Sequence, residues 1–230
     1  MNFDEGKKMK YKYVMFDLDG TLLDTIGDIT DNINRAMQEF GYPLHTREEA
    51  RSYINDGALK LIQRALPDGE NSEENARRVL SRYLEIYDEH VNEKTVPYDG
   101  IKELIEKLKN DGVSMSVVSN KPERHVKLLA EYHFGKDTFS YISGTGADTP
   151  KKPDRICVEK AVNAMGISYD GLIYVGDSHV DVQTAHNAEI PCAGVTWGFH
   201  GKDGFYDKTP DFLIDNTIQL YELIKNGKTQ

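Results

Sequence analysis

The sequence is poor in cysteine and has no long apolar run. Its only two cysteines, Cys157 and Cys192, are far apart and lack a metal-type spacing. Two free thiols in a reducing compartment are therefore a simpler expectation than a disulfide. Residues 1–12 are polar and charged, unlike a signal peptide, and no apolar run approaches the roughly 20 residues of a membrane-spanning helix. We expect a soluble, cytoplasmic protein.

Positive charge is also in short supply. The 230 residues include 38 acidic and 28 basic side chains, which gives a formal net charge of −10. Such a surface repels phosphodiester backbones and anionic lipids, so nucleic-acid and membrane partners are not expected. It repels small anionic substrates too, and a site for a phosphate ester would need local cations. The candidates are Lys121, Lys151, Lys152 and a bound metal.

The sequence does contain a set of short apolar runs that stop at polar residues. They cover residues 13–16, 113–118, 172–175 and 191–195. Helical patterns separate them; one begins after Gly100 and another at Pro153. Strand alternating with helix predicts an α/β fold, a Rossmann-like open parallel sheet with helices on both faces. Residues 197–209 are predicted to form a loop, followed by an edge strand at 210–215 and a last helix capped by Asn216.

The stretch from about residue 28 to residue 91 breaks this alternation, because its apolar residues recur at helical spacing throughout. Glycine and proline concentrate at both of its ends. No strand pattern intervenes, so we expect an inserted α-helical cap domain. The predicted domains are a catalytic core at 1–24 and 97–230 and a helical cap at 25–96.

The first apolar run ends in two carboxylates, Asp17 and Asp19. Residues two apart in an extended segment point the same way, so both side chains can face one site. Gly20 and Thr21 follow and let the backbone turn sharply beside the acids. A strand end followed by an Asp-Gly turn explains this segment equally well when it is taken alone.

Polar groups also stand at three later positions next to predicted strand ends, the edge at which open α/β sheets bind ligands. They are Ser119-Asn120-Lys121, Lys151-Lys152-Pro153, and Asp177-Ser178 with Asp181 one helical turn further on. A hydroxyl, an amide and ammonium groups suit phosphate oxygens, and buried carboxylates should seek a cation. Taken singly, the three segments also fit a helix cap, a solvated lysine pair and a capped helix start.

These four segments resemble the four motifs of the haloacid dehalogenase-like hydrolase superfamily, through Asp17, Asp19, Ser119, Lys152, Asp177 and Asp181. The helical insert lies where that superfamily places its first type of cap. The resemblance implies that Asp17 attacks phosphorus and forms an aspartyl-phosphate, while Asp19 protonates the leaving oxygen and later activates water. It implies Mg²⁺ bound by Asp17, Asp19 and Asp177, with Asp181 orienting the metal shell. Ser119 and Lys152 would hold the phosphoryl oxygens.

Within the superfamily, the chain is most similar to the phosphoglycolate phosphatase-like family. Residues 17–25 read DLDGTLLDT, and Asn55-Asp56-Gly57 is similar to the family's glycine-rich cap loop. The predicted substrate-binding residues are Thr21, Asn120, Asn55, Asp56, Gly57 and Arg64. The chain departs from the family pattern where Asn55 replaces a glycine and Arg155 replaces the second proline of the Lys-Pro motif. Glu189 stands where a helix-ending glycine is usual.

Several other members of the superfamily fit less well. Haloacid dehalogenases lack the acid at Asp19, and P-type pumps need membrane helices. Mutases of the β-phosphoglucomutase type usually carry valine at Thr21 and a cap histidine, whereas His45 and His90 lie in no matching context. The predicted function is magnesium-dependent hydrolysis of a small phosphate monoester, first of all 2-phosphoglycolate, by a monomer or homodimer. The alternatives are a pyrophosphatase, a sugar or nucleotide monophosphatase, the mutase and a catalytically silent phosphate-binding module.

Overall fold

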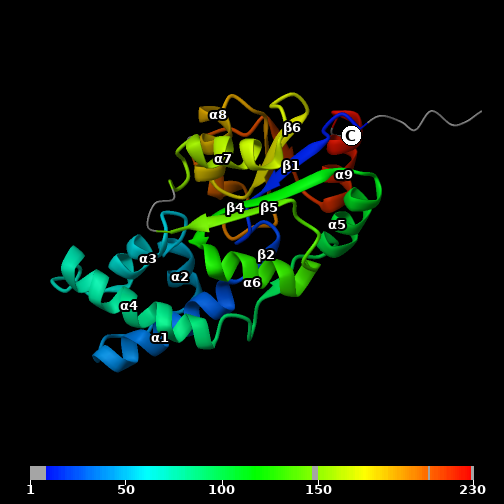
Figure 1. Cartoon of the computed structure of the whole chain (residues 1–230). Coiled ribbons are helices and arrows are strands. Elements are labelled where there is room, and N and C mark those ends of the chain that lie inside the picture. The colour runs from blue at the N-terminus through cyan, green and yellow to red at the C-terminus, as the bar shows by residue number, and fades with distance from the viewer. Residues whose placement is uncertain (1–8, 147–149, 207, 229–230) are drawn as a thin grey trace, which may run out of the picture.

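A six-stranded sheet forms the centre of the computed structural model, which describes residues 9–146, 150–206 and 208–228 (Figure 1). Its strands are β1 Tyr13–Phe16, β4 Ser114–Pro122, β5 Tyr141–Thr145, β6 Leu172–Gly176, β7 Cys192–Val195 and β8 Phe212–Ile214. The spatial order is β5-β4-β1-β6-β7-β8, and each neighbouring pair is parallel. The predicted open parallel sheet is confirmed, with the first strand in the interior of the sheet.

Helices cover both faces of the sheet. They are α5 Ile101–Asn110, α6 Glu123–Phe134, α7 Ile156–Met165, α8 His179–Asn187 and α9 Thr217–Asn226. Figure 1 shows α7 and α8 on one side and α5 and α6 on the other. Met15 packs in a cluster with residues of α7 and α8, whereas Val14 and Phe16 pack with residues of α5, α6 and α9. The alternation along β1 thus buries successive side chains under different helical layers.

The predicted helical insert lies between β2 Leu23–Asp24 and β3 Val96–Pro97, which pair antiparallel. It consists of α1 Ile26–Phe40, α2 Arg47–Tyr53, α3 Ala58–Ala65 and α4 Glu73–Glu89. Asp28 is buried at the base of α1 and accepts the backbone N–H groups of Lys94 and Thr95 at 2.8 and 2.9 Å. These hydrogen bonds join the segment just before β3 to the first turn of α1. The division into a core at 1–24 and 97–230 and a cap at 25–96 stays a prediction.

Three local expectations differ from the structure. β5 and the pair β2–β3 were not expected as strands, and residues 197–209 contain a short 3₁₀ helix, η1 Gly201–Phe205. Pro153 lies in a turn in which the N–H of Asp154 donates to the carbonyl of Lys151, so α7 begins at Ile156 instead. Asn216 does cap α9, as expected, because its side chain accepts the N–H of Gln219.

Two predictions from composition, on the cysteines and on membrane-spanning helices, can be compared with the structure. Cys157 and Cys192 are both free and buried. In the part of the chain that the structure describes, we find no helix of the length and hydropathy needed to cross a bilayer.

Candidate active site

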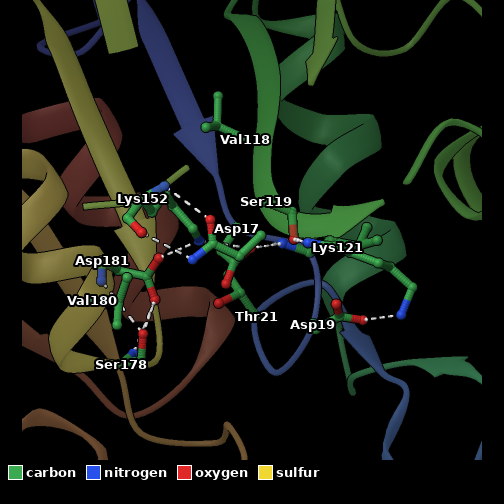
Figure 2. Close-up of polar contacts among 12 residues, drawn as sticks. Asp17, Asp19, Thr21, Val118, Ser119, Lys121, Lys152, Ser178, Val180 and Asp181 are labelled. Atoms are coloured by element: carbon green, nitrogen blue, oxygen red, sulfur yellow. Dashed lines mark hydrogen bonds and ion pairs between the residues drawn. The ribbon is translucent and has the colours of Figure 1, made fainter. Parts of the chain in front are cut away.

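Asp17 and Asp19 follow β1 directly, and both line one cavity between the sheet edge and the helical insert. Their carboxylates are nevertheless paired with different lysines. Asp17 Oδ1 lies 2.9 Å from the ammonium nitrogen of Lys152, and Asp19 Oδ1 lies 3.0 Å from that of Lys121. Asp19 Oδ1 also accepts the hydroxyl of Thr25 at 2.6 Å. Figure 2 shows Lys152 on one side of Asp17, and Lys121 with Asp19 on the other side.

Lys152 is the cation at the buried side of the site. Its Nζ contacts Asp17 and, at 2.7 Å, Asp181 Oδ1, and its side chain is only 3% exposed. Burial opposes the charge on Lys152, but the carboxylates of Asp17 and Asp181 outweigh burial and hold its pKa well above the ordinary value. The side chain is therefore an ammonium ion at neutral pH.

Three buried carboxylates converge here, those of Asp17, Asp177 and Asp181, with one oxygen of each within 4.8 Å of the others. Burial and the neighbouring Asp181 and Asp17 raise the pKa of Asp177 well above its usual range. Burial likewise raises the pKa of Asp17 to about 7, although Lys152 opposes the shift. One ammonium group facing three carboxylates leaves an excess of negative charge, which a divalent cation would relieve.

The backbone packs closely around Asp177. A Cβ added at Gly20 would lie 2.3 Å from Asp177 Oδ2, and one added at Gly198 would lie 2.3 Å from Asp177 Cβ. Asp177 Oδ2 accepts the backbone N–H of Phe199 at 3.0 Å, and Thr21 Oγ1 lies 3.4 Å from Asp177 Oδ1. The two glycines thus let two loops close around one carboxylate.

Asp181 has two functions in the structure. Its Oδ2 accepts the N–H of Ser178 at 3.1 Å and the Ser178 hydroxyl at 2.6 Å, which completes a capping box at the start of α8. Its Oδ1 remains for Lys152. The capped helix start that the sequence suggested and the charge cluster are therefore the same feature.

Ser119 and Asn120 lie within β4 and do not cap the next helix, which begins at Glu123. The side-chain amide of Asn120 donates to the carbonyls of Asn55 at 3.2 Å and Lys152 at 3.1 Å, and its oxygen accepts the N–H of Lys152 at 2.9 Å. Asn120 thereby joins the helical insert to the loop that carries Lys152.

The cavity over these groups has one polar wall and one largely apolar wall, and it opens to solvent. The sheet edge supplies carboxylates, Ser119 and the two lysines. The insert supplies Leu61 from α3, and Tyr83, Leu84 and Tyr87 from α4. Such a cavity places a small group of charged side chains beneath a mostly apolar roof.

The chain is similar to known proteins along most of its length. Residues 14–195 match the family model described as haloacid dehalogenase-like hydrolase. The chain belongs to this family. It is 35% identical to phosphoglycolate phosphatase 1 of Pseudomonas aeruginosa, over 91% of this chain and 78% of the relative. It is 30% identical to the phosphoglycolate phosphatase of Vibrio parahaemolyticus, over 93% of this chain and 96% of the relative.

Solved structures of the family share the same architecture. A protein from Lactobacillus delbrueckii subsp. bulgaricus, provisionally named a phosphoglycolate phosphatase, superposes with a TM-score of 0.88 at 30% identity. The match covers 95% of this chain and all of that one. A predicted phosphoglycolate phosphatase from Haemophilus somnus gives a TM-score of 0.85 at 26% identity, over 93% of this chain and 98% of that one.

Of the cap residues predicted to bind substrate, Asn55 and Gly57 line the cavity of this hydrolase. Asp56 and Arg64 are not among the described lining residues. They form an ion pair with one another, and Arg64 also donates to the carbonyls of Tyr53 and Ile54 at 3.0 and 3.3 Å. These two residues therefore brace the loop that presents Asn55, and a direct contact with substrate stays a prediction.

Two departures from the family pattern have a visible backbone consequence. Asn55 has φ of 90° and Glu189 has φ of 57°, both in the left-handed region that favours glycine. The structure thus keeps the backbone conformation that a glycine would adopt, and asparagine tolerates it better than glutamate does.

The residues that sequence reasoning missed come mainly from the roof and the rim of the cavity. Tyr83 and Tyr87 belong to the helical pattern of residues 28–91, and such a pattern indicates which side chains are buried but not what they face. His125 also lines the cavity, and its Nε2 lies 2.5 Å from Asp88 Oδ1 of α4. The sequence indicated Lys121 as a cation near the site, but it did not predict the ion pair of Lys121 with Asp19.

Proposed function

We propose that this hydrolase is a magnesium-dependent phosphatase that acts on a small phosphate monoester, with 2-phosphoglycolate as its substrate. The observation that carries the proposal is the separation of Asp17 from Asp19. One carboxylate belongs to a buried acidic cluster with Lys152, and the other faces the cavity beside Lys121. Relatives at 30–35% identity are named phosphoglycolate phosphatases.

In this proposal Asp17 is the nucleophile. Its carboxylate attacks phosphorus in line with the ester bond and forms an aspartyl-phosphate, and the alcohol leaves from the opposite side. Lys152 touches Asp17 already, so it can follow the negative charge onto the phosphoryl oxygens. Ser119 lines the same cavity and would donate its hydroxyl to another of these oxygens, as would Asn120 if its amide is released from Asn55.

The carboxylate cluster fits a divalent cation. Asp17, Asp177 and Asp181 are buried, lie within reach of one ion and offer the hard oxygen ligands that Mg²⁺ prefers. Asp17 and Asp177 would bind the ion, with the backbone carbonyl of Asp19 as a third ligand, and Asp181 would orient the remaining ligands. When bound, Mg²⁺ supplies positive charge that offsets the repulsion between the carboxylates and the phosphate.

Asp19 would serve as the general acid and base. It gives a proton to the ester oxygen as the P–O bond breaks, and the product alcohol leaves. The same carboxylate then takes a proton from the water that attacks the aspartyl-phosphate, which releases inorganic phosphate and restores Asp17. The position of Asp19 in the cavity lining, two residues beyond Asp17, supports this role.

The remaining parts of the proposal concern the surroundings of the reaction. Thr21 lies against Asp177 and would steady the phosphate loop, while Asn55 and Gly57 would approach the substrate from the cap. A cytoplasmic location, an assembly of one or two copies and the absence of nucleic-acid partners are predictions that follow from the sequence alone.

A panel of phosphate esters tests this function directly. We expect Mg²⁺-dependent phosphate release, fastest from 2-phosphoglycolate, and loss of release in excess EDTA. Asp17→Asn should abolish turnover but keep the thermal unfolding profile, whereas the exposed Asp68→Asn in the cap serves as a matched control with unchanged activity. The absence of release from every ester would defeat the proposal, and an active Asp17→Asn would exclude Asp17 as the nucleophile.

A further inference from the structure

Lys121 lies beside Asp19, on the side of the cavity away from the carboxylate cluster. Its side chain is 6% exposed, and its Nζ lies 3.0 Å from Asp19 Oδ1 and 4.7 Å from the centre of the Tyr87 ring. Figure 2 shows Lys121 and Asp19 together on the side opposite Lys152 and Asp181. Lys121 is therefore a buried cation next to the group that would protonate the ester oxygen.

Tyr87 contributes an independent observation. Its side chain is 1% exposed and lines the same cavity, yet its hydroxyl makes no hydrogen bond with any described residue. A buried hydroxyl without a partner is costly, and a ligand atom that accepts a hydrogen bond would remove that cost. Burial and the nearby Asp19 raise the pKa of Tyr87 well above its usual range, so the phenol keeps its proton and can donate it.

The other basic side chains of the cavity are paired with the carboxylate cluster or uncharged. Lys152 already contacts Asp17 and Asp181. Burial lowers the pKa of His125, which favours the neutral imidazole even though Asp88 is its neighbour. Of the described residues that line the cavity, Lys121 is thus the cation that lies beside Asp19.

We propose that Lys121 and the Tyr87 hydroxyl bind a carboxylate on the leaving group, and that the enzyme selects esters whose carboxylate lies one carbon from the ester oxygen. This inference rests on the proposed phosphatase function and names the residues that choose its substrate class. In such an ester a single carbon separates the protonated oxygen from the carboxylate carbon. One small region must therefore supply an acid and a cation side by side, as Asp19 and Lys121 do.

The decisive comparison uses 2-phosphoglycolate and its neutral counterpart 2-hydroxyethyl phosphate. Wild-type enzyme should prefer the carboxylate ester, and Lys121→Met should lower the ratio of the two kcat/KM values about 100-fold, the scale of a lost buried charge pair. Tyr87→Phe keeps the ring beside Lys121 and should lower the ratio about 10-fold. Lys127→Met, on the exposed face of α6, should leave the ratio unchanged.

The ratio separates recognition from positioning, because Lys121 also touches Asp19. If Lys121→Met slows both substrates by the same factor, Lys121 only positions the acid and the inference is wrong. A wild-type enzyme that hydrolyses both esters equally well would overturn it too. Tyr87→Phe gives a second reading if Lys121→Met does not fold.

A binding measurement separates this inference from the proposed function. Calorimetry on Asp17→Asn with Mg²⁺ should show tighter binding of 2-phosphoglycolate than of 2-hydroxyethyl phosphate. Adding Lys121→Met to that variant should remove the difference. Equal binding of the two esters by Asp17→Asn refutes the role of Lys121, whereas a wild type without turnover but with this difference refutes only the phosphatase function.

Discussion

Replacing Lys152 with methionine removes the ammonium group that contacts both Asp17 and Asp181 while it keeps most of the side-chain volume. All three side chains are largely buried. The change leaves the carboxylate cluster without its nearest positive charge. Removing one partner of a buried ion pair costs about 3–5 kcal/mol, because the remaining charge has neither water nor a counter-ion. For a protein of this size, that corresponds to a fall in Tm of about 6–20 °C.

The size of this effect should depend on pH. Burial raises the pKa of Asp17 to about 7, above the ordinary value for an aspartate. A carboxyl group with a raised folded-state pKa binds its proton more tightly when folded, so stability falls as pH rises from about 4 to about 7. Without Lys152, this penalty is larger and extends to higher pH. The loss of Tm should therefore be larger at pH 8 than at pH 5.

Thermal unfolding in EDTA, followed by circular dichroism at both pH values, measures this loss. Lys127→Met is the matched control. The exposed Lys127 ammonium pairs, among the described residues, with Glu123 of the same helix, so its loss should shift Tm by about 1 °C or less. Mg²⁺ should raise the Tm of wild type by binding to the folded state. If Lys152→Met unfolds at the wild-type temperature in EDTA at pH 8, Lys152 does not balance the cluster and the charge argument fails.

Three further changes probe the surroundings of the site. Gly198→Ala places a Cβ 2.3 Å from that of Asp177 and should cost about 1–3 kcal/mol in urea unfolding, with a matching loss of activity; an unchanged activity would contradict the tight fit. Glu189→Gly relieves a φ of 57° and should raise the free energy of unfolding by about 0.5–1 kcal/mol, so a destabilised variant would contradict the strain. Burial lowers the pKa of His125, so protons bind the unfolded chain more tightly and stability falls as pH drops below about 6.5. His125→Gln should flatten this part of the pH profile, and an identical slope would show that His125, despite its contact with Asp88, does not cause it.

The sheet was predictable wherever a strand is a continuous apolar run, as at β1 and β6. β5 escaped prediction because its five residues include Ser143 and Gly144, which suggest a turn. The structure explains the glycine by close packing: a Cβ at Gly144 would lie 2.5 Å from the carbonyl oxygen of Lys121 and from Glu123 Cα. A close approach between two backbones is a tertiary property, and a local pattern does not contain it.

In the candidate site, too, some features follow from a local sequence pattern and others depend on tertiary packing. The acids of the first strand end were predictable from two neighbouring positions in the sequence. Their pairing with different lysines was not, because Lys121 reaches Asp19 and Lys152 reaches Asp17 from separate segments of the chain. The part played by Tyr87 was equally hidden, since it depends on how α4 packs over the core rather than on the helical spacing itself.

Asn120 forms separate hydrogen bonds to the helical insert and to the backbone of Lys152. Its amide nitrogen donates one hydrogen to Asn55 and the other to the carbonyl of Lys152, while its oxygen accepts the N–H of Lys152. Each contact uses a separate hydrogen or lone pair. A withdrawal of the cap loop would break the bond to Asn55 and leave the two bonds to Lys152 intact. The backbone at Lys152 is therefore held to β4 by two hydrogen bonds that do not involve the helical insert.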